Sequence, residues 1–261
     1  MVNKISKESI KLLIDEYHNR NKSHYIQRNL FDYSSLSDNL IILNNNIDTL
    51  SFLESQGCRN FYRYYFFINP SGSKVDRNFP DDLVVISEYI YTGQPSSTVE
   101  MHHKNLGFQR YAILRKMSIV KNTLNLDIDS KLQNSSIDDF RYIQKNLNLE
   151  FDYITERIPK NNEIKEAIIS KKIFKLVSND QIQGFIWIDR KRAICELKYI
   201  FVDRRYRGQG VGRKLMNGLI FESRNAKKIQ LWVLDNNSKA INLYANFGFN
   251  FENLKLSVYL G

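Results

Sequence analysis

The alternation of hydrophobic and polar residues in the second half of the chain predicts a meander of three strands. Runs rich in β-branched and aromatic residues cover 172–178, 182–189 and 193–202, and this composition and length are typical of strands. The polar segments between the runs are short enough for tight turns. We therefore expect the three strands to pair in antiparallel fashion.

The segments around this meander have helical spacing. A helix is expected to start at Ser136, a candidate N-cap followed by acidic residues, and a second helix covers 161–170. After the meander the pattern predicts, in order, a helix over 212–224, a strand over 228–234, a helix over 237–247 and a closing strand pair over 249–260. This mixture of helices and strands predicts an α/β fold of the α+β type.

The first half contains a similar succession of elements. Strands are expected over 59–69 and 81–91, separated by a loop with Pro70, Gly72 and Pro80. The pattern then predicts a short helix over 96–107 and a strand over 109–120.

A shift of 141 residues superimposes the ends of the two halves. It places Gly107-Phe108 on Gly248-Phe249, with strand, turn, helix and strand in the same order before and after them. Our interpretation is two repeats, residues 1–130 and 131–261, with a connection near 121–136. Because helices often end at a glycine before a strand, a chance match is the alternative.

Charge is divided unevenly between these halves. Residues 1–130 hold 15 Lys and Arg against 14 Asp and Glu, whereas residues 131–261 hold 23 against 14. The second half therefore favours an anionic partner, either a nucleic acid or a phosphorylated cofactor. The four histidines and two cysteines show no metal-ligand spacing, and we expect Cys195 to be a small buried residue.

A glycine-rich loop follows the third strand of the meander. Its sequence, VDRRYRGQGVGRKLM, joins a strand end to a helix start, where backbone N–H groups and the helix dipole favour an anion. The loop supplies three glycines for a close main-chain approach and three arginines for charge, which are Gly208, Gly210, Gly212, Arg205, Arg207 and Arg213. Neither the P-loop pattern nor the GxGxxG dinucleotide pattern matches it. A turn with solvated arginines is the alternative.

Two motifs at a defined separation narrow this choice. RYRGQG at 205–210 fits the pattern R/Q-x-x-G-x-G/A, and NSKAINLYANFGF at 237–249 fits N-x-x-A-x-x-[apolar]-Y-x-x-x-G-F. Both resemble signatures of the Gcn5-related N-acetyltransferases, the GNAT superfamily, and the resemblance covers residues 137–261. It implies the GNAT fold, a mixed and mostly antiparallel sheet flanked by helices, here in two tandem domains.

The resemblance also implies an activity and a cofactor site. GNAT enzymes transfer an acetyl group from acetyl-CoA to a primary amine by direct attack in a ternary complex. The loop amides would hold the pyrophosphate, the preceding strand would pair with the pantetheine arm, and a strand N–H would polarise the thioester carbonyl. The implied cofactor-binding residues are Ile200, Val202, Arg207, Gly208, Gln209, Gly210, Val211, Gly212, Arg213 and Asn237. The phosphates would then explain the basic excess.

Tyr244 stands at the tyrosine of the second motif. The resemblance implies that its phenol protonates the departing thiolate, and the reference pKa values of the two groups differ by only about 1.5 units. A core tyrosine on an amphipathic helix is the alternative.

Glu196 precedes Val202 by six residues and resembles the general-base glutamate of histone-acetyltransferase members. Regular strand alternation places it on the same face as Lys198, Ile200 and Val202. An ion pair with Lys198 or Arg192, a solvated charge at the strand end, or a water chain in place of a glutamate base are the alternatives.

The first half lacks the glycine loop, which the shift would place near 64–69, and has His103 at the position of Tyr244. We expect a degenerate GNAT-like domain that serves as scaffold, pseudo-dimer partner or substrate wall. His102 and His103 are interpreted as polar residues of a surface helix. The aromatic run at 61–67 favours a core strand over a groove or a nucleobase surface.

The predicted function is an acetyl-CoA-dependent N-acetyltransferase, and a non-catalytic acyl-CoA sensor or interaction module is the alternative. The expected partners are acetyl-CoA and an amine acceptor, which is a small molecule, a peptide or a protein, without nucleic acid or membrane. The amphipathic N-terminus and the lack of long apolar runs predict a cytoplasmic protein. We expect a monomer with an internal pseudo-dimer or a homodimer.

Overall fold

The computed structural model describes residues 4–21, 27–29, 36–56, 60–69, 79, 83–120 and 131–261. Cys58, most of the loop expected between 69 and 80, and most of the connection expected near 121–136 lie outside these ranges.

The chain divides into two compact units. Unit 1 comprises Met1–Ile113 with Leu254–Gly261, and unit 2 comprises Leu114–Asn253. This division differs from the expected boundary between residues 130 and 131, because each half contributes part of its last strand to the other unit.

In unit 2 the described strands follow the order β7-β12-β11-β10-β9-β8, where β7 is Gln109–Val120. Residues 114–120 of β7 pair with β12 in this sheet. The elements of this unit are β8 (Gln133–Asn134), a 3₁₀ turn (Ile137–Asp139), α3 (Phe140–Glu150), α4 (Asn161–Ile169), β9 (Ile173–Ser178), β10 (Gln181–Lys191), β11 (Ile194–Val202), a 3₁₀ turn (Arg204–Tyr206), α5 (Val211–Glu222), β12 (Lys228–Leu234) and α6 (Ser238–Ala245), besides the first residues of β13 (Asn250–Leu260).

The expected meander is confirmed in unit 2, where β9, β10 and β11 pair in antiparallel fashion. Asn179 and Asp180 form the first turn with φ of 48° and 55°, the backbone that a two-residue hairpin requires. Ser136 begins the helical segment as expected, and its backbone N–H donates to the Asp139 carboxylate at 2.7 Å.

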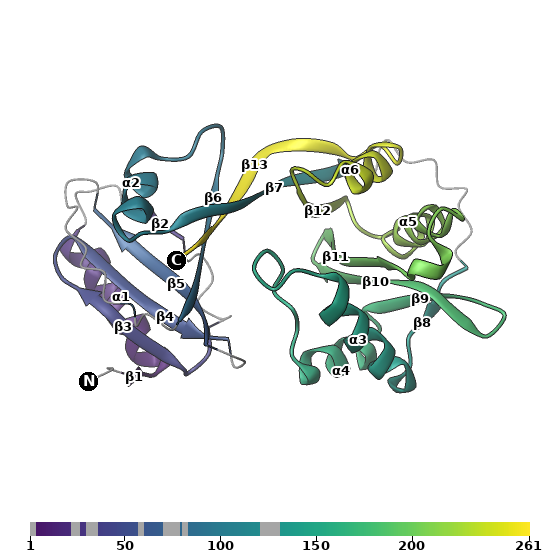
Figure 1. Cartoon of the computed structure of the whole chain (residues 1–261), viewed down its shortest axis with the longest axis horizontal. Coiled ribbons are helices and arrows are strands. Elements are labelled where there is room, and N and C mark those ends of the chain that lie inside the picture. Colours follow the sequence, from purple (N-terminus) through teal and green to yellow (C-terminus); the bar gives the residue numbers. More distant parts are fainter. Residues whose placement is uncertain are drawn as a thin grey trace. The chain divides into compact units, whose positions relative to one another are not determined.

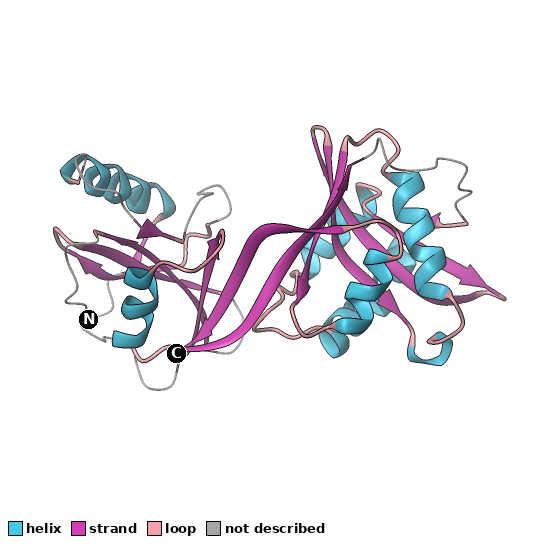
Figure 2. Ribbon diagram, turned by 90° about the horizontal axis from the view of Figure 1, so that it is seen from above, coloured by secondary structure: helices cyan, strands magenta, loops and turns pink. Residues whose placement is uncertain are grey.

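Helices cover both faces of this sheet (Figure 2). On one face α5 and α6 bury a cluster that includes Leu215, Leu219 and Cys195, so Cys195 is the buried residue that we expected. On the other face α3 and α4 cover a second cluster with Phe185 and Tyr199. Burial of each large apolar side chain contributes about 1.5–3 kcal/mol to the stability of the fold. This packing holds in place the sheet that carries the site.

Unit 1 has the same plan (Figure 1). Its strand order is β1-β3-β4-β5-β6-β13, with residues 255–260 of β13 against β6. The elements are β1 (Lys4–Ile5), α1 (Lys7–Arg20), β2 (Gln27–Arg28), β3 (Leu40–Asn45), β4 (Thr49–Ser55), β5 (Phe61–Ile68), β6 (Val84–Tyr91), α2 (Ser97–Asn105) and β7 (Gln109–Val120). The side chains of α1 pack on one cluster and those of α2 on another.

The expected strand–helix–strand repetition is present in the structure. The helices α2 and α6 begin at Ser97 and Ser238, and the following strands begin at Gln109 and Asn250, so both pairs are 141 residues apart. The aromatic run at 61–67 forms the core strand β5, as expected.

Three expectations about elements are wrong. The closing strand pair over 249–260 is the single strand β13, because β7 from the other half supplies the neighbouring strand of β12. Strands β3 and β4 lie in a segment for which we predicted no element. His102 and His103 are buried, with 6% and 1% of their surface exposed, because the face of α2 that carries them packs on the sheet.

Candidate active site

The parallel strands β11 and β12 diverge in the middle of the unit 2 sheet. They pair from Ile194 opposite Lys228 to Leu197 opposite Leu231, and no pairing follows. The other edge of β11 stays paired with β10 as far as Val202. From Lys198 onward, β11 therefore has one edge without a strand partner among the described residues.

A β-bulge marks the point of divergence. Leu197 lies opposite Ile188 and Tyr199 lies opposite Trp187, so that Lys198 has no partner on β10. Such a bulge bends its strand and locally increases the twist. It also reverses which side chains face which side of the sheet beyond Lys198.

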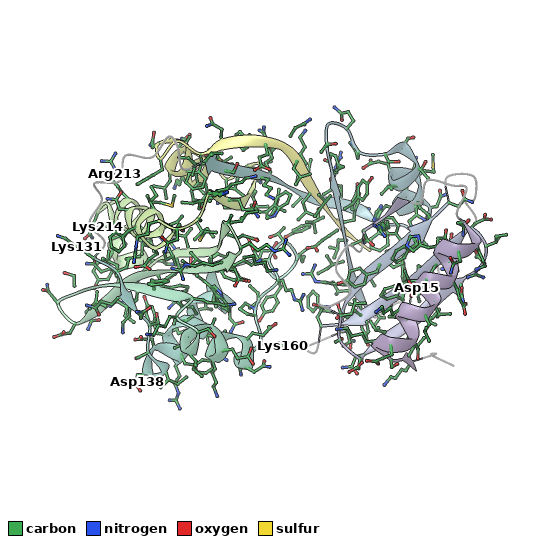
Figure 3. The ribbon with its side chains drawn as sticks, turned by 180° about the vertical axis from the view of Figure 1, so that it is seen from behind. Asp15, Lys131, Asp138, Lys160, Arg213 and Lys214 are labelled. Atoms are coloured by element: carbon green, nitrogen blue, oxygen red, sulfur yellow. The ribbon has the colours of Figure 1, made fainter. Side chains whose placement is uncertain are left out.

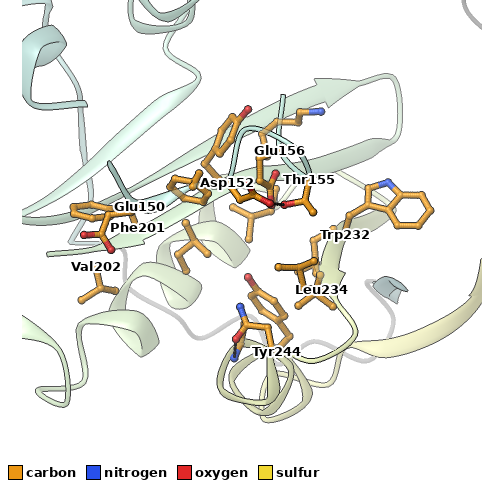
Figure 4. A pocket seen from close by; sticks show the side chains of 18 of the residues that line it. Glu150, Asp152, Thr155, Glu156, Phe201, Val202, Trp232, Leu234 and Tyr244 are labelled. Carbon is orange, nitrogen blue, oxygen red and sulfur yellow. Dashed lines mark hydrogen bonds between the residues drawn. The ribbon is translucent and has the colours of Figure 1, made fainter. Parts of the chain in front are cut away.

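A cavity of about 320 Å³ lies at the divergence (Figure 4). One wall is the second half of β11 with Ile200 and Val202, and the end of β12 forms another. The loop after α3 and the start of α6 close the remaining sides. Lining residues from these parts are Glu150, Phe151, Asp152, Thr155, Glu156, Trp232, Leu234, Asn237, Ala240 and Tyr244.

Tyr244 projects into this cavity from α6 (Figure 4). Only 5% of its surface is exposed, yet no described residue is recorded as a hydrogen-bond partner of its hydroxyl. Burial, reinforced by the charge of Glu156, raises the pKa of Tyr244 above its ordinary value. Tyr244 is thus a buried core tyrosine whose side chain also lines the cavity, while its predicted role as proton donor stays a prediction.

The glycine loop places free N–H groups beside the cavity. Gly208 and Gly210 adopt left-handed conformations with φ of 78° and 75°, and Gly210 caps the start of α5. A Cβ at either position would meet no atom within 4 Å. Among the described residues, no backbone acceptor is found for the N–H groups of Gly208, Gly210, Val211, Gly212 and Arg213. This turn and helix start form the type of geometry that binds phosphate.

The arginines before the glycines contribute differently from what we expected. Arg205 forms an ion pair with Asp203 at 2.8 Å, and Arg207 forms one with Glu150 at 2.7 Å. Arg207 also donates from Nε to the Val202 carbonyl at 3.1 Å. The charge of Arg205 is therefore balanced by Asp203, whereas Arg207 shares the Glu150 carboxylate with Arg204. Arg207 also links the loop to the end of β11.

Arg213 provides charge of another kind. It is exposed at the start of α5 and makes no ion pair with a described residue. Lys214 follows it, and both side chains project outward from the helix (Figure 3). These two residues therefore add positive charge at the start of α5, beside the loop amides.

Glu196 does not line the cavity. Its carboxylate pairs with Lys198 at 3.2 Å, one of the alternatives that the sequence allowed. The expectation that Glu196 shares a face with Ile200 and Val202 is wrong, because the bulge at Lys198 interrupts the alternation. Ile200 and Val202 pack with the α5 side of the sheet, as do the neighbours of Glu196 in the strand, Cys195 and Leu197.

Sequence reasoning missed the loop between α3 and α4. This loop brings the carboxylates of Asp152 and Glu156 to the cavity. The Asp152 carboxylate accepts hydrogen bonds from the Ile154 N–H and the Thr155 hydroxyl, both at 3.1 Å. Tyr199 anchors the end of the loop by donating its hydroxyl to the Arg157 carbonyl. The loop matches no motif, and its two acidic residues are matched by Arg157 and Lys160, so its composition gave no signal either.

Asn237 combines structural and cavity-facing positions. Its side-chain oxygen accepts a hydrogen bond from the Ala240 N–H at 3.1 Å and caps α6. The residue also lines the cavity. Of the twelve residues predicted for the site, the cavity itself brings together Ile200, Val202, Arg207, Asn237 and Tyr244, while the others, except Glu196, lie in the adjoining loop.

The diverging parallel strands, the bulge and the amide-rich loop define a GNAT-type acyltransferase fold. Residues 142–249 match the model of the Acetyltransferase (GNAT) family. This segment is accordingly a GNAT acetyltransferase domain, and GNAT family enzymes use acetyl-CoA.

Individual relatives agree with this assignment. An 83-residue segment is 37% identical to the spermine/spermidine N(1)-acetyltransferase of Bacillus subtilis. The aligned segment covers 31% of this chain and 49% of that protein. The chain therefore spans about half the length of this curated relative. In the described residues, no helix is long and apolar enough to cross a membrane.

Solved structures resemble the chain over both halves. A GCN5-related N-acetyltransferase from Sphaerobacter thermophilus has a TM-score of 0.60 at 12% identity, over 84% of this chain and 82% of that one. A tandem GNAT protein from the clavulanic acid biosynthesis pathway has a TM-score of 0.55 at 10% identity, over 85% of this chain and 82% of that one. The fold is a two-domain GNAT fold.

Proposed function

We propose that unit 2 transfers the acetyl group of acetyl-CoA to an aliphatic amine. The observation that carries this proposal is the convergence of three features at one cavity: the unpaired edge of β11, the loop amides of 208–213, and the Tyr244 hydroxyl. Bound acetyl-CoA supplies the acyl group as an activated thioester.

The chain can bind acetyl-CoA through two kinds of interaction. The free edge of β11 presents backbone N–H and C=O groups to an extended, amide-bearing arm, as a sheet edge does to an added strand. The loop amides and Arg213 provide hydrogen bonds and charge for phosphates. Asn237, which lines the same cavity, is placed to contact the arm.

Tyr244 donates the proton that the leaving group needs. As the amine nitrogen forms its bond to the carbonyl carbon and the C–S bond breaks, the hydroxyl gives its proton to the thiolate sulfur, and the surplus proton of the acylated nitrogen then restores the hydroxyl. Its raised pKa keeps Tyr244 protonated throughout the neutral range, so that the proton is present at each turnover.

Two carboxylates in the cavity support a cationic acceptor. Aliphatic amines are protonated at neutral pH, and the carboxylates of Asp152 and Glu156 favour such a cation in the cavity. The similarity to a spermine/spermidine acetyltransferase supports a polyamine as the first acceptor to test. We assign to Glu156, whose charge acts on Tyr244, the removal of the proton from the amine. The general-base prediction for Glu196 remains its competitor.

Calorimetry with acetyl-CoA on a matched pair of glycine variants tests the loop. Gly210→Glu should weaken binding at least about tenfold, because its carboxylate would repel the phosphates. Gly93→Glu is the control, since Gly93 also has a positive φ of 68° and open space around its Cβ. It should bind as the unaltered protein does. Equal binding by both variants would remove the loop from the proposed site.

Release of the CoA thiol in the presence of spermidine and other amines separates an enzyme from a sensor. The proposal predicts amine-dependent release by the unaltered chain. Binding of acetyl-CoA without release for any amine in a broad panel would favour the sensor.

A further inference from the structure

Each unit has a pair of parallel strands that diverge, and the two units differ in what lies at the divergence. In unit 1, β5 and β6 run parallel from Phe61 opposite Val84 to Tyr64 opposite Ser87, and then diverge. This four-residue pairing matches that of β11 and β12 in unit 2. The unit 1 sheet thus contains the same divergence that opens the acyl-CoA cavity in unit 2.

In unit 1 the chain itself occupies this divergence. β4 pairs with one edge of β5 along the whole strand, from Thr49 opposite Ile68 to Ser55 opposite Tyr62. The strand β2 must therefore lie on the other edge, where Gln27 and Arg28 pair with Ile68 and Phe67 beyond the end of β6 pairing. It takes the position on β5 that is unpaired on β11.

Asn29 follows β2 and forms side-chain hydrogen bonds at the point where β5 and β6 diverge. Its side-chain amide donates to the Tyr64 carbonyl at 2.8 Å and to the Ser87 hydroxyl at 3.3 Å. The same side chain accepts a hydrogen bond from the Phe66 N–H at 2.8 Å. The residue therefore bridges β5 and β6 and satisfies the backbone groups that an extended ligand would otherwise meet.

His103, the residue of unit 1 that corresponds to Tyr244, also forms hydrogen bonds within its own unit. His103 interacts through Nδ1 with the Val99 carbonyl at 2.8 Å, and through Nε2 with the Ser87 hydroxyl at 2.9 Å. Its ring stacks on Tyr259 at 3.9 Å. Since Nδ1–H donates to Val99, Nε2 accepts from Ser87, whose oxygen accepts from Asn29. The Tyr244 hydroxyl has no such partner.

Strand β5 of unit 1 is also more regular than strand β11 of unit 2. The register of β4 and β5 is continuous, whereas β11 is interrupted by the bulge at Lys198. A regular strand with both edges paired has no backbone groups left for a ligand in this region.

We infer that residues 27–29 are a built-in strand that fills the acyl-CoA slot of unit 1, so that each chain takes up one acyl-CoA, in unit 2. The inference rests on the proposed function for the cofactor site in unit 2. It gives the N-terminal half the role of a closed, non-catalytic partner whose slot is satisfied by its own sequence.

Calorimetric stoichiometry tests the inference on the full chain. One equivalent of acetyl-CoA per chain is expected, and this binding should be lost in Gly210→Glu. Two equivalents, or one equivalent that persists unchanged in Gly210→Glu, would overturn the inference. Absence of binding would count against the proposed cofactor site in unit 2, and the exchange experiment below then decides about unit 1.

Hydrogen exchange of the Phe66 amide provides the second readout. Asn29→Ala should accelerate its exchange about tenfold, the effect expected for loss of one buried hydrogen bond. Asn29→Asp, which keeps an acceptor for this N–H, should change it less, and Asn105→Ala on the exposed side of α2 should not change it. Saturating acetyl-CoA should leave it unaltered. Equal exchange in the unaltered chain and in Asn29→Ala, or protection by acetyl-CoA, would contradict a filled slot.

Discussion

At the scale of single residues, the proposed chemistry rests on Tyr244 and Glu156. The tyrosine hydroxyl faces the cavity without a hydrogen-bond partner among the described residues, and burial raises its pKa. Glu156 lines the same cavity from the loop after α3. We propose that the tyrosine is the proton donor and the glutamate the proton acceptor, so that the two come from different elements of the site.

Two glutamate variants distinguish the candidate bases. Glu156→Gln keeps the size of the side chain and removes its charge, and it should lower kcat/KM for a polyamine by about tenfold or more, the equivalent of about 1.4 kcal/mol. Glu196→Gln should have the smaller effect, because Glu196 lies outside the cavity. Steady-state kinetics on both proteins provide the measurement. A larger loss in Glu196→Gln would return the role of base to Glu196.

The sequence assigned candidate site residues from motifs, and it missed features that depend on the shape of the chain. Asn237, Tyr244 and the glycines were assigned because their residue types and spacing resemble a family pattern. The face of Glu196 was mistaken because a bulge has no sequence period, and alternation fails beyond it. The residues Asp152 and Glu156 were missed since a loop becomes part of a site only through tertiary packing.

At the scale of elements, long periodic segments were predictable. The strand over 228–234 and the strand over 109–120 have the expected limits. In contrast, β3 and β4 were missed although residues 40–55 contain two apolar runs around the polar segment 44–48. The single strand β13 was mistaken for a pair because sequence does not reveal which half supplies a neighbouring strand.

The buried histidines of α2 predict an acid-sensitive unit 1. Burial lowers the pKa of His102 to about 3 and that of His103 to about 4. The unfolded state, with ordinary pKa values near 6.5, binds more protons than the folded state below that pH. Stability should therefore fall from about pH 6.5 toward pH 4, by up to about 1.4 kcal/mol per pH unit for each histidine.

Urea unfolding between pH 7 and pH 4 checks this expectation. The double variant His102→Gln/His103→Gln, which removes both imidazole rings of α2, should show a flatter pH dependence in this window even if its stability at pH 7 is lower. The same slope in both proteins would assign the acid sensitivity to other groups, such as His18, whose pKa burial also lowers, or carboxylates.

At the scale of the whole molecule, each half contributes strand residues to the other unit. Residues 255–260 complete the sheet of unit 1 against β6, and residues 114–120 complete that of unit 2 against β12. Loss of the C-terminal residues should thus damage the N-terminal unit.

A chain that ends at Asn253 tests this exchange. It loses the buried side chains of Val258 and Tyr259, which should cost unit 1 about 3–6 kcal/mol of unfolding free energy. Scanning calorimetry should show the transition of unit 1 at a lower temperature. Tyr259→Phe, which removes the hydroxyl hydrogen bond to Glu100 and keeps the ring, should have a much smaller effect. An unchanged transition after truncation would contradict the strand exchange.

Amine-dependent release of the CoA thiol by Tyr244→Phe, measured together with acetyl-CoA binding, tests the proposal that unit 2 transfers an acyl group with Tyr244 as the acid. The account predicts that kcat falls about 100-fold or more while the Kd for acetyl-CoA stays within about threefold, and that the exposed control Tyr111→Phe retains full turnover. Unchanged turnover in Tyr244→Phe would contradict the account.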